Sequence, residues 1–259
     1  MISPLVIVAV EHAVGQITLN RPDKRNALTA AMLQQILDGL DLFERGGDVR
    51  VVLIRGVGAA FCSGLDLDDM KSAHERTGSF DFELLLEVFA RLAHHPNPTI
   101  AMVHGVAIAG GCELALHCDL RIGSPSARFA MPLAKLGLVI PGAAAERLVQ
   151  IVGLPAAREM LFTGDPIDGL RAERMGLLTR LVDAGQLEAA TEQMVGAMAQ
   201  RAPLSLQAMK RILDNFGPKL TTAERAATDM ERRQINGTQD MREGLQAFFE
   251  RRTPIFRGV

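Results

Sequence analysis

The sequence has no tryptophan and no tyrosine, and its 259 residues include only three cysteines. It therefore lacks most of the flat side chains on which nucleic-acid bases stack. Its 28 Lys and Arg stand against 30 Asp and Glu, a net charge of −2, so the positive excess that binds phosphate backbones is missing as well. We expect no nucleic-acid partner.

Cysteine is too scarce and too irregularly spaced for a disulfide framework or a zinc site. Cys62, Cys112 and Cys118 form no CxxC pair, and no histidine stands beside them at metal-ligand spacing. This pattern predicts a reduced, cytoplasmic protein without a metal. The apolar run at residues 5–10 follows no basic residues and ends at Glu11, which predicts a strand rather than a signal peptide. No stretch approaches the roughly 20 apolar residues of a membrane-spanning helix.

What is present is an ordinary globular composition, 48% hydrophobic and 22% charged, with alternating strand and helix patterns. Residues 5–10 and 16–19 predict a hairpin that turns at Val14-Gly15, and Thr29 predicts the N-cap of a helix that runs to Arg45. Continuous apolar runs predict buried strands, and a helix is expected between the last two, at residues 112–118. These strands cover residues 49–55, 99–103 and 119–123.

This alternation predicts an α/β fold with a mostly parallel sheet. From Gly142 onward the pattern is helical, with no convincing strand after residues 178–182, and the composition shifts near Gln186. We expect an α/β core over residues 1–185. Residues 186–259 would form a helical region that packs on this core or on a neighbouring subunit.

Two glycine turns follow buried strands, Ser63-Gly64 and Gly110-Gly111. The carboxyl ends of parallel strands are where ligands bind, and glycine lets backbone N–H groups approach a ligand closely. Two N–H groups that converge on one oxygen would form an oxyanion hole. The alternative is that the glycines only make tight turns. The phosphate-binding GxGxxG and Walker A patterns are absent, which disfavours a nucleotide site.

Glu113 lies three residues after Gly110, in the first turn of the predicted helix. As a structural residue it would interact favourably with the helix dipole. As a functional residue it would be a carboxylate in a dry pocket, with a raised pKa and a role in proton transfer. No other Asp or Glu occurs between Asp119 and Glu146.

Other reactive side chains are weaker candidates. Cys62 and Cys112 flank the predicted oxyanion hole, but small buried cysteines usually serve packing. His104 and His117 lie in apolar segments and are expected to be hydrogen-bonded core residues, whereas His94 and His95 are expected on a solvated loop.

At these residues the sequence resembles the enoyl-CoA hydratase/isomerase (crotonase) superfamily, and the likeness covers nearly the whole chain. Several motifs in the family's order are far more specific than any one alone. They are Asn20-Arg21-Pro22-Asp23-Lys24-Arg25-Asn26-Ala27-Leu28, Ala60-Phe61-Cys62-Ser63-Gly64-Leu65-Asp66-Leu67, Gly110-Gly111-Cys112-Glu113-Leu114-Ala115, Phe162-Thr163-Gly164-Asp165-Pro166-Ile167, and residues 243–256.

The resemblance implies a crotonase-like α/β spiral of ββα units with a helical C-terminal trimerisation region, assembled as a trimer or a dimer of trimers. It also implies an acyl-CoA ligand and no cofactor beyond the coenzyme A of the substrate. The thioester oxygen would be held by the N–H groups of Ser63 and Gly110, with Glu113 as the proton-transfer residue. Other residues would contact the substrate: Lys24, Arg25, Ala27, Gly64, Leu65, Asp66, Leu67, Pro132 and Leu133, and, from a neighbouring subunit, Phe248 and Arg251.

The likeness breaks at the second acid/base position. Family hydratases hold a water between two glutamates, the second of them in a Pro-Glu pair that is Pro132-Leu133 here, and some isomerases use a glutamate where this chain has Gly142. Glu146, Asp68 or Asp69 could substitute, but nothing in the sequence places them in the pocket. Three readings follow: a hydratase or dehydratase with one glutamate, an isomerase or decarboxylase, and a non-catalytic acyl-CoA binding protein.

Overall fold

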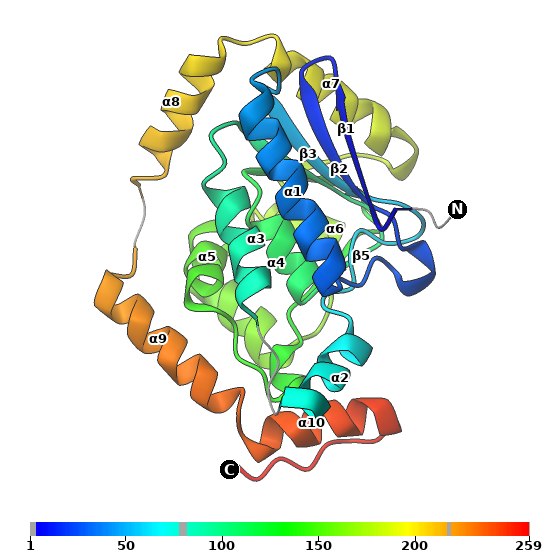
Figure 1. Ribbon diagram of the computed structural model, residues 1–259, viewed down its shortest axis with the longest axis vertical. Coiled ribbons are helices and arrows are strands. Elements are labelled where there is room, and N and C mark those ends of the chain that lie inside the picture. Colours follow the sequence, from blue (N-terminus) through cyan, green and yellow to red (C-terminus); the bar gives the residue numbers. More distant parts are fainter. Residues whose placement is uncertain (1–3, 78–81, 217–218, 259) are drawn as a thin grey trace. The chain divides into compact units, whose positions relative to one another are not determined.

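The computed structural model describes residues 4–77, 82–216 and 219–258 (Figure 1). It contains two compact units, each built from several separate stretches of chain. The first unit holds the described parts of residues 1–65, 81–129 and 167–217, and the second holds those of 66–80, 130–166 and 218–259.

The first unit is built on a six-stranded sheet with the order β1-β2-β3-β4-β6-β9. β1 is antiparallel to β2, and all the other neighbours are parallel, as the sequence predicts. β4 is buried along its whole length, which explains its continuous apolar sequence. The strands are β1 (Val6–Glu11), β2 (Val14–Leu19), β3 (Val51–Gly56), β4 (Thr99–Val103), β6 (Leu120–Gly123) and β9 (Arg180–Leu181).

The predicted hairpin exists, but its turn differs from the prediction. Val14 and Gly15 belong to β2, and the two-residue turn consists of His12 and Ala13, both at positive φ (50° and 65°). Gly15 lies in the strand, and the ring of Phe43 packs against it. A Cβ at this position would come within 2.8 Å of that ring. Close packing, rather than a turn, explains this glycine.

Helices of the first unit cover its sheet and join its strands. The hydroxyl of Thr29 accepts a hydrogen bond from the Met32 N–H (3.2 Å), so the predicted N-cap begins α1, whose buried face packs on β1 and β2. The other elements here are the 3-10 turns η1 (Pro22–Lys24) and η3 (Ala184–Gln186) and the helices α1 (Ala30–Gly46), α3 (Glu83–Ala93), α4 (Gly110–Leu116), α6 (Gly169–Arg174), α7 (Leu187–Ala199) and α8 (Pro203–Leu213).

A second, three-stranded sheet has the order β5-β7-β8, and the sequence analysis missed it. Its strands have only two or three residues, too few to show an alternating pattern. They are β5 (Val106–Ile108), β7 (Arg128–Ala130) and β8 (Ile167–Asp168).

The first two C-terminal helices, α7 and α8, belong to the first unit, so the grouping differs from the predicted boundary at residue 186. Leu187, Val195 and Ala199 of α7 pack with Val14, Leu53 and other buried residues of the central strands. On α8, the ammonium of Lys210 is buried and lies 2.8 Å from the Asp119 carboxylate. Apolar burial and this ion pair join the two helices to the strands.

The second unit is mostly helical. It contains α2 (Leu67–Thr77), the 3-10 turn η2 (Leu133–Leu136), α5 (Gly142–Thr163), α9 (Thr222–Ile235) and α10 (Gln239–Glu250). A kink divides α5 at Gly153, just before Pro155, and Thr221 with Glu224 forms a capping box that begins α9. Gly244 of α10 lies directly against the Leu136 backbone, so η2 and α10 are in contact.

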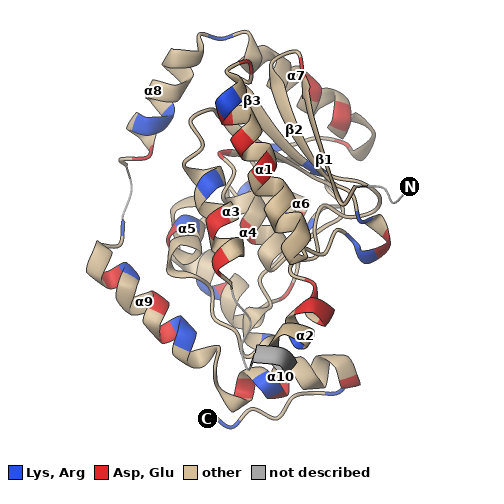
Figure 2. Ribbon diagram, viewed as in Figure 1, with Lys and Arg blue, Asp and Glu red and all other residues tan. Residues whose placement is uncertain are grey.

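Arginines and acidic residues are mixed along α9 and α10, whereas β1, β2 and β3 carry few charges (Figure 2). None of the described helices is long and apolar enough to cross a membrane.

The hairpin turn gives a test of backbone strain. His12 is exposed and lies at φ 50°. Glycine at this position should raise the free energy of unfolding by about 0.5–1 kcal/mol, because relief of a left-handed conformation exceeds the flexibility that glycine adds. Urea denaturation measures the change. The control is Glu11→Gly, in the exposed end of β1, which should lower stability; a loss in both variants would contradict the strained turn.

Candidate active site

The two glycine turns lie against each other in the first unit. A Cβ on Gly64, which has φ 96°, would come within 3.4 Å of the Gly110 nitrogen and 2.8 Å of the Ile108 oxygen. A Cβ on Gly110 would in turn lie 3.6 Å from the Leu65 nitrogen. The chain thus brings the N–H-bearing backbone of both turns together, although the Gly110 turn follows β5 of the three-stranded sheet and not a strand of the six-stranded sheet.

Residues 60–64 are held between two other segments. On one side, the Cys62 N–H donates to the Val106 oxygen (3.0 Å) and the Cys62 oxygen accepts from the Ile108 N–H (3.0 Å). On the other side, the Leu28 N–H donates to the Gly64 oxygen (2.8 Å). Bonds on both sides of a single short segment fix its position more firmly than a surface loop could.

Asn26 is a central residue of this junction, whereas the sequence had indicated it only as part of a family motif and of the segment expected to contact CoA. It is fully buried at φ 56°, and its side-chain oxygen accepts from the Arg21 N–H (2.8 Å). Its amide nitrogen is 2.8–3.2 Å from three carbonyl oxygens, those of Val57, Ala60 and Phe61. Asparagine tolerates the left-handed region and offers both donors and acceptors. These properties were the sequence signal that could have indicated a structural role for Asn26.

Ser63 does not have a free N–H group to offer a substrate in this structure, so its predicted role needs correction. The Ser63 N–H donates to the Arg25 oxygen (3.0 Å), and the Gly64 N–H reaches the Cys62 sulfur (3.4 Å). The next N–H, that of Leu65, lies beside Gly110. The geometry therefore favours Leu65 over Ser63 as the partner of Gly110, and the register of this turn could not be read from sequence spacing.

The residue before Gly110 is held in a strained conformation. Ala109 has φ 49° and ψ −120°, a region that non-glycine residues rarely occupy, and its oxygen accepts from the Glu113 N–H (2.9 Å). Gly111 must be glycine, because a Cβ there would lie 2.2 Å from the Cys62 oxygen. Strain and close approach together set the direction of the first turn of α4.

Glu113 is buried, with 3% of its surface exposed, in the first turn of α4. The free N–H groups of a helix start favour a negative charge at this end. The helix that begins at the Gly110 turn thus carries the one carboxylate that the sequence analysis singled out.

The cysteines are buried thiols. All three are free and buried, and the Cys62 sulfur donates to the Asn26 oxygen (3.2 Å). Burial raises the pKa of Cys62 to about 12, and burial together with the nearby Glu113 raises the pKa of Cys112 as well. These shifts support the packing role that we predicted for them.

The histidines behave only partly as predicted. His117 is buried, and its Nδ1 lies 2.7 Å from the backbone oxygen of Glu113. His104 is hydrogen-bonded, with its Nε2 2.9 Å from the Gly58 oxygen, but it is half-buried and not a core residue. His94 is exposed as expected, but His95 is 1% exposed, and burial lowers its pKa. His95 does lie on the loop between α3 and β4, as predicted, but it is not solvated, and the Asn97 N–H lies 3.2 Å from its Nδ1.

The other predicted CoA residues of the first unit lie around the Asn26 junction. Lys24 and Arg25 are exposed, and Ala27 is buried. The Lys24 oxygen accepts from the Ser63 hydroxyl (3.4 Å), so this segment and the Ser63 turn are in contact, although they are far apart in sequence.

The remaining predicted residues belong to the second unit. Asp66, predicted to contact CoA, caps α2, because its carboxylate accepts from the N–H groups of Asp68 (2.9 Å) and Asp69 (3.2 Å). Leu67 begins α2, and Pro132 precedes Leu133, the half-buried first residue of η2.

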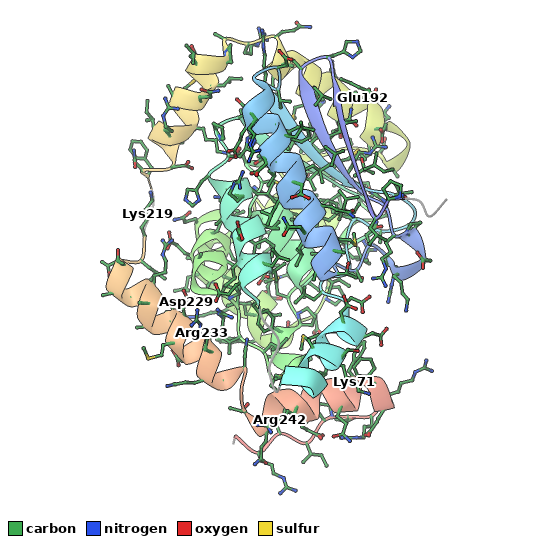
Figure 3. All side chains as sticks on the ribbon, viewed as in Figure 1. Lys71, Glu192, Lys219, Asp229, Arg233 and Arg242 are labelled. Atoms are coloured by element: carbon green, nitrogen blue, oxygen red, sulfur yellow. The ribbon has the colours of Figure 1, made fainter. Side chains whose placement is uncertain are left out.

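Phe248 and Arg251 lie at the end of α10. Phe248 is 55% exposed and meets Phe249 edge-on, with the ring centroids 5.7 Å apart. The ammonium of Lys71, labelled on α2 in Figure 3, is 4.9 Å from the Phe249 ring centroid. Arg251 is exposed and ends the helix at φ 54°.

Comparison with known proteins agrees with this geometry. Residues 9–259 match the profile of the family described as enoyl-CoA hydratase/isomerase. The 2,3-dehydroadipyl-CoA hydratase of Escherichia coli K12 is 33% identical over 98% of both chains. The crystal structure of a carnitinyl-CoA hydratase from Mycobacterium avium superposes with a TM-score of 0.86 at 32% identity, over the whole of both chains.

The chain belongs to the enoyl-CoA hydratase/isomerase family.

It is an enzyme of this family with the crotonase fold, and its substrates are acyl-CoA thioesters. Another similar structure is that of a methylmalonyl-CoA decarboxylase, with a TM-score of 0.87 at 26% identity over the whole of both chains. The reaction itself depends on the acid/base residues.

The three carboxylates named as possible substitutes for the second glutamate all lie in the second unit. Glu146, in the second unit, accepts from Arg225 (3.0 Å) and from the Leu220 N–H (3.1 Å), and only 13% of its side chain is exposed. Asp68 and Asp69 are exposed on α2. Among the described residues, no group of three His, Cys, Asp or Glu could hold a metal ion.

The cysteines yield a prediction with a definite pH dependence. A pKa of about 12 leaves Cys62 about a thousandfold less ionised near neutral pH than an ordinary thiol, and only the thiolate reacts with iodoacetamide. In the native protein, we expect the rate of cysteine alkylation not to increase between pH 8 and pH 9. In the urea-unfolded protein, the rate should increase over this range at all three cysteines. Mass spectrometry measures the modification. A native thiol that titrates near pH 8.5 would contradict the packing role.

Proposed function

We propose that this enzyme hydrates enoyl-CoA thioesters, or dehydrates 3-hydroxyacyl-CoA thioesters, through an enolate of the thioester. The observation that carries the proposal is that the Leu65 and Gly110 turns meet at the start of the helix that bears Glu113. Two backbone N–H groups there would stabilise the negative oxygen of an enolate. The buried carboxylate of Glu113 would exchange the proton.

One glutamate would have to perform both proton transfers. In hydration, Glu113 would take a proton from water as the oxygen attacks the β-carbon, and the same proton would then pass to the α-carbon. General acid-base assistance is typically worth about 10²–10⁴-fold. With Leu133 at the second position, hydration should be slower than in a two-glutamate enzyme, but still possible.

A second candidate reaction is supported by Leu133 and by the likeness to a methylmalonyl-CoA decarboxylase. In decarboxylation, the bond between the α-carbon and the carboxylate breaks and carbon dioxide leaves. The electron pair of that bond enters the enolate, which the two N–H groups would hold until the α-carbon takes a proton from water. In isomerisation, one carboxylate moves a proton between two carbons. Both reactions require fewer acid/base groups than hydration does.

We further propose a cytoplasmic homo-oligomer, a trimer or a dimer of trimers, that needs no cofactor beyond the coenzyme A of its substrate. The three free cysteines suit a reducing compartment. The exposed ring of Phe248 and the exposed Arg251 suit contact with the nucleotide end of coenzyme A bound to a neighbouring subunit.

Replacement of Glu113 and Leu133 distinguishes the reactions. Glu113→Gln should lower turnover of the active thioester by at least about 10²-fold, whereas Leu133→Glu should raise crotonyl-CoA hydration by about 10²-fold or more, because it supplies the second carboxylate. Mass spectrometry of products from 2-enoyl-, 3-enoyl- and malonyl-type CoA thioesters identifies the reaction.

The matched control for Leu133→Glu is Ala134→Glu, which adds the same charge at the exposed next residue of η2 and should change nothing. Isomerisation or decarboxylation without hydration would replace the first proposal by the second. Micromolar acyl-CoA binding without any turnover would reject both in favour of a binding protein.

The backbone donors are tested by exchanging single N–H groups for oxygen. Leucic acid at position 65 turns that amide into an ester, which removes its N–H and weakens the Gly64 carbonyl as an acceptor for Leu28; loss of the N–H should lower kcat by about 10²–10³-fold. The same exchange at Ser63 should change kcat by less than about threefold, because that N–H donates to Arg25. Equal losses at both positions would restore Ser63 as a donor.

A further inference from the structure

His117 closes the helix that carries Glu113, and no step of the proposed reaction uses it. Its exposed fraction is 4%, and both its backbone N–H (3.0 Å) and its ring Nδ1 (2.7 Å) reach the carbonyl oxygen of Glu113. Because a carbonyl oxygen only accepts, Nδ1 must carry the proton. The geometry thus fixes the tautomer of the ring.

The ring itself is fixed by Phe89 of the neighbouring helix α3. The two rings are stacked, with centroids 4.7 Å apart and planes 4° from parallel. Phe89 is 2% exposed, so the stack lies in the core of the first unit. His117 therefore connects the Glu113 backbone to a second, independently packed helix.

The opposite side of Glu113 is also held. Its N–H donates to the oxygen of Ala109, the strained residue before Gly110. α4 has only seven residues, and so short a helix is not stable through its own hydrogen bonds. The orientation of the Glu113 backbone therefore depends on the bonds at its two ends.

We propose that His117 is a positioning residue for Glu113, which it holds through the Nδ1 bond to the Glu113 carbonyl. This inference rests on the proposed function of Glu113. A single carboxylate must reach the proton donor, which is water in hydration and a carbon in isomerisation. It must also reach the carbon that receives the proton. A displacement of about 1 Å can cost about 10²-fold in rate.

Two variants separate the hydrogen bond from the packing. His117→Phe keeps a ring to stack on Phe89 and removes the donor, so kcat should fall by about 10- to 100-fold while KM stays within about twofold. His117→Asn places an amide nitrogen the same number of bonds from Cα and loses the stack; it should retain kcat within about threefold.

A matched control is present on α3. His94 ends that helix with the same pair of bonds, from its N–H (2.9 Å) and its Nδ1 (2.9 Å) to the Ala90 oxygen, but α3 carries no proposed catalytic residue. His94→Phe should leave kcat and KM unchanged. Thermal unfolding of all three variants shows how much each loses in stability.

The kinetic outcomes are decisive. A His117→Phe enzyme with wild-type kcat overturns the inference. The inference is also overturned if both His117 variants lose kcat equally and their loss of kcat parallels the fall in their melting temperatures. If Glu113→Gln leaves turnover unchanged, the proposed function fails, and the catalytic role of His117 with it.

One measurement does not depend on turnover. Nitrogen-15 NMR of the wild-type protein, assigned by comparison with His117→Phe, should show the His117 ring protonated at Nδ1. A ring that carries its proton on Nε2 alone overturns the inference, whatever reaction the enzyme catalyses.

Discussion

The site depends on one constraint: backbone hydrogen bonds hold residues 60–64 between two segments that are distant in sequence. Val106 and Ile108 bind this stretch on one side, and Arg25 and Leu28 bind it on the other. The amide of Asn26 reaches the carbonyls where the stretch begins. Buried backbone groups need hydrogen-bond partners. An N–H group in this stretch that is already bonded within the protein, such as that of Ser63, is not available to a substrate.

The same constraint gives Glu113 its setting. The turn that presents Gly110 also starts α4, so the Gly110 N–H and the Glu113 carboxylate lie on one short helix, and the Leu65 backbone lies beside Gly110. Close backbone contacts leave no room for a side chain at Gly111. The backbone around Gly110 and Gly111 is thus fixed by main-chain contacts.

Much of this could be predicted from the chain alone. The apolar strands, the cap at Thr29 and the two glycine turns are local patterns, and the structure contains them. The sequence predicted the hairpin turn at Val14-Gly15, but Gly15 lies within the strand. Glycine is needed there because the ring of Phe43, which is distant in sequence, packs against it. The burial of His95 and the strands of the second sheet also arise from contacts that no local period records.

The sequence by itself determined the family, the single glutamate and its missing partner, because these are matters of residue identity and order. Only the tertiary structure decided that the Ser63 N–H is bonded to Arg25 and that Leu65 lies beside Gly110. It also revealed the bond from His117 to the Glu113 carbonyl. The reason is that a hydrogen bond is chosen by distance and direction in space, and the spacing of residues along a chain fixes neither.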